Sequence, residues 1–104
     1  MNISISNEIK EKVPCTKLAV LKYSVDTEET NPELWKYMKE NTIPAILNEL
    51  ETKTVTELKN VDTSRKAYKA FGKDPGRYRV SSEALIRRIK QGKDLYKINT
   101  VVDT

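Results

Sequence analysis

Two stretches near the start of the chain carry the hydrophobic pattern of β-strands. Residues 2–5 (Asn-Ile-Ser-Ile) alternate polar and apolar side chains, which is typical of a half-buried strand. Residues 17–25 (Lys-Leu-Ala-Val-Leu-Lys-Tyr-Ser-Val) form a nearly continuous apolar run, which favours a strand buried on most of both faces. Between these stretches, Ser6 is placed to cap a short helix over residues 7–12, which ends before Pro14.

Helical spacing replaces the strand pattern after residue 30. Asn31 is a favoured cap and Pro32 a favoured first helical residue, so a helix is expected to begin there. Pro44 cannot donate to the helical ladder, which predicts a break or kink near residues 41–43. A second helical segment, capped at Thr42 or Ile43, is expected to follow. The apolar positions of the two segments are Leu34, Trp35, Met38, Ile46, Leu47 and Leu50.

Two more helices are predicted in the second half. The first contains residues 67–71, has possible caps in residues 62–64 and ends at Gly72. The second is capped by Ser81 or Ser82 and ends just before Gly92. Its core-facing residues on a helical wheel are Leu85, Ile86 and Ile89.

Strands followed mainly by helices predict an α+β fold, a short mixed or antiparallel sheet with helices packed on it. The length allows one domain, residues 1–104. Asn99 is placed to cap a helix that has room for only about one turn before Thr104. We therefore expect a truncated domain, whose exposed apolar surface favours a homodimer.

Composition excludes much chemistry. The chain has no histidine, which excludes Ser–His and Cys–His nucleophile pairs and HExxH zinc sites within it. The single cysteine, Cys15, has no partner for a disulfide or a thiolate zinc cage, which fits a reducing cytoplasm. No apolar run approaches the roughly 18 residues of a membrane span, and the N-terminus lacks the apolar region of a signal peptide. We therefore expect a cytoplasmic protein without a metal, a cofactor or a membrane partner.

Positive charge is concentrated in the second half. Residues 1–60 contain 8 Lys and Arg against 10 Asp and Glu, whereas residues 61–104 contain 11 against 5. Aromatic residues are interspersed among these cations, a combination suited to neutralising phosphates and stacking on bases. The alternative is an ordinary lysine-rich surface over a small core. The candidate RNA-binding residues are Lys73, Arg77, Arg79, Arg87, Arg88 and Lys93.

Glu83 and Arg87 are four residues apart on the predicted last helix, so we expect them to pair on its exposed side. Arg88 flanks the apolar stripe near Leu85, so its stem is expected to pack and its guanidinium to be directed toward a specific role.

The run from Lys73 to Arg88 and its continuation from Gly92 to Thr104 resemble the B3/B4 domain of the phenylalanyl-tRNA synthetase beta chain and its small stand-alone relatives. The family has a serine, an arginine six residues on, and an Ile-Asn-x-x-Val-Asp signature. The matching residues are Ser82, Arg88, Ile98, Asn99, Val102 and Asp103. The resemblance is specific over about residues 65–104 and covers only the N-terminal half of the family domain.

The resemblance implies a sheet-and-helix fold, tRNA binding and a part in editing wrongly charged aminoacyl-tRNA during translation. The family's editing pocket draws on residues beyond the Val-Asp signature, including a histidine, so no catalytic residue carries over. Ser82, Glu83, Asn99 and Asp103 are expected to be ligand-binding or structural. Three hypotheses follow: an RNA-binding module, part of an editing hydrolase, or a fold that binds a small molecule or protein without RNA. The third predicts an ion network of Arg79, Glu83 and Arg88.

Overall fold

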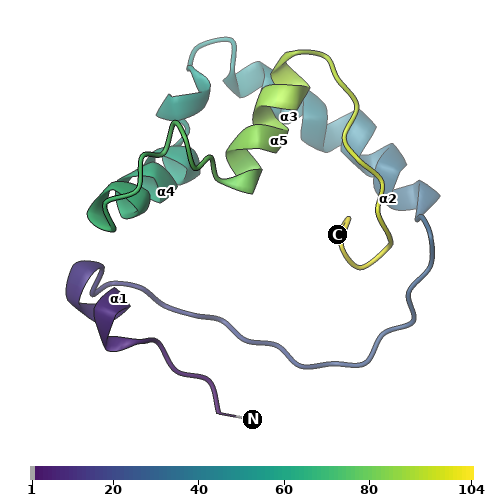
Figure 1. Ribbon diagram of the computed structural model, residues 1–104. Helices are drawn as coiled ribbons and strands as arrows, with labels where there is room; N and C mark the ends of the chain where they lie inside the picture. The colour runs from purple at the N-terminus through teal and green to yellow at the C-terminus, as the bar shows by residue number, and fades with distance from the viewer. Residues whose placement is uncertain (1) are drawn as a thin grey trace.

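The computed structural model describes residues 2–104 and is built from helices joined by loops (Figure 1). No strand is present in these residues, so the α+β prediction, with its sheet, is wrong. The helical elements, in chain order, are α1 (Asn7–Lys12), α2 (Pro32–Tyr37), the π-helix η1 (Met38–Thr42), α3 (Ile43–Glu49), the 3-10 turn η2 (Val55–Glu57), α4 (Lys59–Ala70) and α5 (Ser81–Lys90).

Both predicted strands lie in drawn-out, exposed backbone. Residues 17–25 belong to the long segment that joins α1 to α2 along the outside of the helices (Figure 1). Leu21 is 84% exposed and Tyr23 is 66% exposed, the opposite of the predicted burial on both faces. A strand also needs a neighbour for its backbone N–H and C=O groups, and none of the described residues supplies one.

The helix pair over residues 32–49 is continuous. Asn31 caps α2 as predicted, since its Oδ1 accepts from the backbone N–H groups of Glu33 and Leu34 at 3.1 and 3.3 Å. Instead of a break, the chain widens into η1, where the N–H of Ile43 donates to the carbonyl of Met38. The wider turn lies directly before Pro44, whose ring would clash with the carbonyl four residues earlier in a regular α-helix. Neither Thr42 nor Ile43 acts as a side-chain cap.

Glycines end α4 and α5 where predicted. Gly72 and Gly92 both have a φ of 73°, which favours a residue without a Cβ. After each helix the two chain-reversing hydrogen bonds of a Schellman motif form, for example Lys73 N to Tyr68 O at 2.9 Å. The predicted starts were less accurate. Helix α4 begins at Lys59, before the expected caps, and α5 begins at Ser81 after Val80, with no side-chain cap from either serine.

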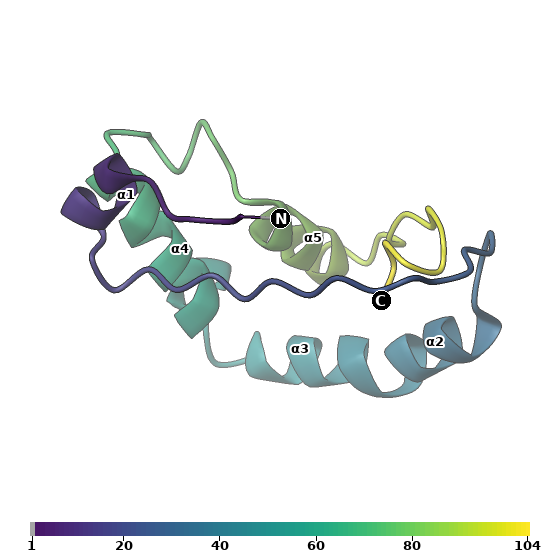
Figure 2. The same cartoon turned by 90° about the horizontal axis from the view of Figure 1, so that it is seen from below.

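The buried apolar core is small. It consists of Val55, Leu58 and Val61 from η2 and the start of α4, with Leu50 and Ile86 packed against them. Ile89 is also buried, on α5. The radius of gyration is 16.5 Å, against about 13 Å for a compact chain of this length. The surface area of 8679 Å² exceeds the roughly 6,000 Å² of a compact chain of this size. Figure 2 shows the layout that produces this area, with the long segment spread beside the helices.

The end of the chain forms a single capped turn. Asn99 Oδ1 accepts from the N–H groups of Val101 and Val102, so Asn99 caps this turn, although the predicted helix does not form after it. Asp103 accepts from the N–H of Ile98 at 3.1 Å, which closes the turn. Thr100 exchanges two hydrogen bonds of 3.0 Å with the backbone of Glu28, linking this turn to the extended segment. Over the described part of the chain, no helix has the length and apolar character needed to cross a bilayer.

Hydrogen exchange tests the unpaired state of residues 17–25. We expect their amides to exchange at nearly unprotected rates, because no backbone hydrogen bond within residues 2–104 engages them. Amides in the middle of α5 should exchange more slowly by a factor on the order of 10³, as in a domain stable by about 5 kcal/mol. Mass spectrometry of peptides spanning the two segments measures the difference. Equal protection of both segments would show that the extended segment is paired.

Candidate nucleic-acid interface

Glu83 is the most buried charged side chain among the described residues. It lies in the first turn of α5, on the side that faces the rest of the structure, and is 1% exposed. Burying a carboxylate without partners is very unfavourable. The expected pairing with Arg87 forms, but the Glu83 carboxylate in it is buried rather than exposed.

Three arginines meet this one carboxylate. Arg65 reaches it from α4, with Nη1 at 3.0 Å from Oε1 and 3.3 Å from Oε2. Arg87 reaches it from α5, through Nη2 at 3.0 Å and Nε at 3.2 Å from Oε1. Arg79, in the loop before α5, is more distant, with Nε at 3.9 Å from the same oxygen. We call Arg65, Arg79 and Arg87 the arginine cluster.

The arginines hold Glu83 in its charged form. Burial raises the pKa of its carboxyl, but the hydrogen bonds from Arg87 and Arg65 and their positive charges outweigh burial. The net pKa of Glu83 therefore lies below its ordinary value. The carboxylate remains ionised at neutral pH and neutralises one of the three guanidinium charges around it.

Two positive charges remain unneutralised at the cluster. The side chains of Arg65, Arg79 and Arg87 are 23%, 46% and 33% exposed, whereas that of Glu83 is 1% exposed. The guanidinium groups thus lie between the buried carboxylate and the solvent. Surplus charge on planar, solvent-accessible guanidinium groups is suited to binding phosphate or carboxylate oxygens.

A second group of cations surrounds Tyr78, in the turn between α4 and α5. Lys73 Nζ lies 5.0 Å and the Arg77 guanidinium carbon 5.5 Å from the centroid of the Tyr78 ring, within cation–π range. The Tyr78 side chain is 46% exposed. Residues Lys73, Arg77 and Tyr78, the Tyr78 turn, lead directly into Arg79 and the arginine cluster.

Arg88 does not join the cluster, contrary to the expected network of Arg79, Glu83 and Arg88. Its Nε and Nη2 donate to the carbonyl of Asp94, and its Nη1 donates to the Tyr96 hydroxyl. The guanidinium also stacks at 4.3 Å from the centroid of the Tyr96 ring. The expectation of a directed guanidinium holds, but the direction is toward the chain's own C-terminal segment.

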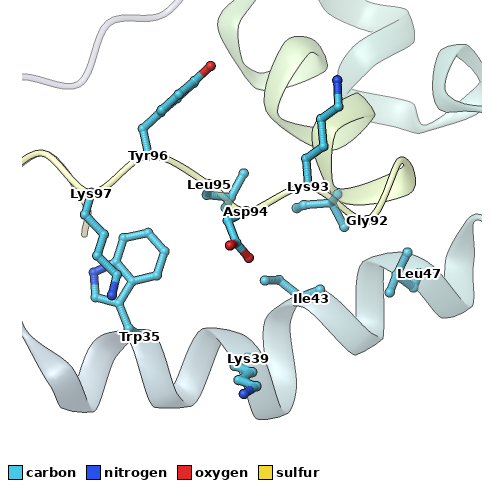
Figure 3. Close-up of a pocket in the computed structure, with 11 residues that line it drawn as sticks. Trp35, Lys39, Ile43, Leu47, Gly92, Lys93, Asp94, Leu95, Tyr96 and Lys97 are labelled. Carbon is cyan, nitrogen blue, oxygen red and sulfur yellow. The ribbon is translucent and has the colours of Figure 1, made fainter.

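Lys93 lies at a groove between α2–α3 and residues 92–97, with its side chain directed away from the groove (Figure 3). The groove encloses about 750 Å³, and its walls include Trp35, Ile43 and Leu47. Trp35 Nε1 is buried without a hydrogen-bond partner in the described residues, and Lys97 Nζ lies 5.2 Å from the Trp35 ring. Lys93 therefore lies near Arg88, whose carbonyl accepts from the Lys93 N–H at 3.0 Å, and apart from the arginines that contact Glu83.

The predicted site residues thus divide into groups. Arg79 and Arg87 come together, as do Lys73 and Arg77, while Arg88 and Lys93 lie at or beside the groove. Ser82 is exposed at the start of α5, and Asn99 and Asp103 serve the terminal turn.

Sequence reasoning missed Arg65. Its spacing in the sequence could have identified it, because Arg65 lies four residues after Val61 and seven after Leu58, on the same face of a helix. Both of these residues are buried. An arginine on the apolar stripe of a helix is expected to pack its stem inward and to direct its head group to a partner.

No protein-family model, curated protein or solved structure matches the chain. The similarity to the B3/B4 domain therefore stays a prediction. Within residues 2–104, no three acidic or cysteine side chains are arranged to share a metal ion.

Replacing Glu83 tests its role in the fold. We expect Glu83→Gln to lower the free energy of unfolding by about 3 kcal/mol, because three guanidinium groups lose their only anion. The matched control is Asp62→Asn, which removes an exposed ion pair of 2.8 Å with Lys66 and should cost no more than about 0.5 kcal/mol. Urea unfolding followed by circular dichroism measures both. Equal losses in the two variants would contradict a central role for Glu83.

The stabilisation by Glu83 should depend on pH. Its pKa in the folded chain lies below that in the unfolded chain, about 4.3, so the unfolded state binds the proton more readily. The stabilisation is fully present above about pH 5 and is lost as the pH falls through the folded-state pKa. The difference in unfolding free energy between wild type and Glu83→Gln should thus be constant from about pH 7 to 5 and shrink below about pH 4. A difference that persists unchanged to about pH 2 would contradict this assignment.

Proposed function

We propose that the chain is an RNA-binding module whose contact face consists of the arginine cluster and the Tyr78 turn. The supporting observation is that three guanidinium groups share one buried carboxylate, which leaves two positive charges at the surface. Lys73 and Arg77 add two cations next to an exposed tyrosine ring. RNA offers phosphates for the cations and unstacked bases for an aromatic ring.

The identity of the RNA is a further part of the proposal. The resemblance of residues 65–104 to the B3/B4 domain supports tRNA as the partner, and with it a role in translation in the cytoplasm. In its extended form, the proposal is that the chain is part of an aminoacyl-tRNA editing protein. The chain alone is assigned binding and no catalytic residue.

A second candidate function is binding of a small molecule without RNA. The groove at Trp35 favours it, because its volume lies in the range of small-molecule sites and it contains an unpartnered indole N–H. Figure 3 shows Asp94 and Lys97 directed toward the groove and the Lys93 side chain directed away from it, so the charged groups that face the groove include one of each sign. Trp35 is the only tryptophan of the chain, so its fluorescence reports on this groove alone.

The salt dependence of tRNA binding tests the RNA proposal. We expect deacylated, fluorescently labelled tRNA to bind with a slope of log Kobs against log salt of roughly −2 to −4 between about 50 and 200 mM, as for three to five neutralised phosphates. Arg77→Ala removes one exposed cation of the contact face and should reduce the steepness of the slope by about one. Fluorescence anisotropy at several salt concentrations gives both values.

The matched control is Lys36→Ala, which removes an exposed cation of the same charge from α2. It should leave the slope unchanged. If it changes the slope as much as Arg77→Ala, or if heparin competes as well as unlabelled tRNA at equal charge, the contact is only general polyanion binding. Quenching of Trp35 emission on adding tRNA, with no loss of affinity in Arg77→Ala, would place the contact at the groove instead.

A further inference from the structure

We infer that the arginine cluster binds the phosphate monoester at the 5′ end of an RNA strand in preference to the phosphodiesters along it. This inference rests on the proposed RNA binding and names the part of the RNA that the cluster recognises. Three features of the cluster support it: its net charge, its unused hydrogen-bond donors, and its rigid base.

The net charge of the cluster matches a monoester. Three guanidinium groups and one carboxylate leave two positive charges within one small volume, because each guanidinium has a nitrogen within 4 Å of Glu83 Oε1. An internal phosphodiester carries one negative charge. A terminal monoester carries close to two at neutral pH, since its second pKa is about 6. Only the monoester neutralises the cluster with a single group.

The unused hydrogen-bond donors of the cluster also favour a phosphate monoester. Arg79 forms no hydrogen bond within residues 2–104, and its 3.9 Å contact with Glu83 leaves its donors available. Arg65 uses only Nη1 on Glu83, and Arg87 uses Nε and Nη2. Each of the three arginines therefore keeps at least one free N–H group. A monoester offers three terminal oxygens, whereas a phosphodiester offers two, so the monoester can engage all three arginines.

Glu83 provides the rigid base. Three guanidinium groups repel one another, and the buried carboxylate between them offsets that repulsion before any ligand arrives. Arg65 and Arg87 are held by direct hydrogen bonds, so little side-chain freedom is left to lose on binding. Arg79, the most exposed and most loosely held of the three, is positioned to turn toward a bound phosphate.

The experiment compares one short single-stranded RNA, labelled at its 3′ end, with and without its 5′ phosphate, the second prepared from the first by phosphatase. We expect the phosphorylated form to bind about tenfold more tightly, the equivalent of about 1.4 kcal/mol. In Arg79→Ala this ratio should fall to about two or less, because the fork that completes the monoester site is lost. Fluorescence anisotropy at one fixed low salt concentration measures the ratio for each variant.

Arg77→Ala is the matched control. It removes an adjacent cation that does not contact Glu83, so it should weaken both RNAs to the same extent and preserve the ratio. Arg79→Lys keeps the charge and removes the planar fork, so its ratio should also fall. It serves as the second variant if Arg79→Ala does not fold, as judged by circular dichroism.

The outcomes separate the two proposals. Equal affinity of the wild type for both RNAs overturns the monoester site and leaves RNA binding standing, whereas no binding of either RNA overturns RNA binding itself. A ratio that survives in both Arg79 variants assigns the end preference to other residues and overturns the inference. A phosphoserine peptide that binds more tightly than the phosphorylated RNA would overturn RNA as the source of the monoester.

Discussion

The buried carboxylate of Glu83 joins α4, α5 and the loop between them, beside the small apolar core that also links the two helices. It binds Arg65 from α4, Arg87 from its own helix and, more weakly, Arg79 from the intervening loop. Helix α5 packs against α3 and η2, and Ile86 of α5 packs on the cluster that contains Val61 of α4. The hydrogen bonds of Arg65 to Glu83 add a polar link between α4 and α5. The positions of the three guanidinium groups, and thus the proposed contact face, follow from where this one carboxylate is buried.

This dependence is strong because the apolar core is small. Only Val55, Leu58, Val61 and Ile89 are buried hydrophobic residues in the described part of the chain. A buried ion pair contributes little net stability relative to well-packed apolar residues, but removing one partner is costly because the other is left without compensation. With three arginines on one carboxylate, removing the carboxylate leaves three positive charges without compensation, whereas in a simple pair it leaves one. The cluster therefore holds surplus positive charge at the surface and also makes the fold dependent on one carboxylate.

Some local features were predictable from the sequence, whereas several helix starts and the features that depend on distant partners were not. The Asn31 cap, the Gly72 and Gly92 helix ends and the Asn99 turn are decided by neighbouring residues, and all were predicted. The strand at residues 17–25 was wrong, because a strand needs a neighbour that no local pattern supplies. At the site, the i,i+4 spacing predicted the pairing of Glu83 with Arg87, but not its burial. The burial depends on Arg65, which lies 18 residues away.

Neighbouring arginines on α5 show why a count of charges overstates a binding surface. Arg87 and Arg88 contribute equally to the net charge of the second half. Arg88, however, uses its Nε, Nη1 and Nη2 donors on Asp94 and Tyr96, so it adds to the positive field but offers no free planar edge to a phosphate. Arg87 keeps Nη1 free, and Arg79 keeps its whole fork. Recognition of a phosphate needs charge and unused donors at the same place. Among the described residues, the arginine cluster combines the two because its carboxylate neutralises fewer charges than it gathers.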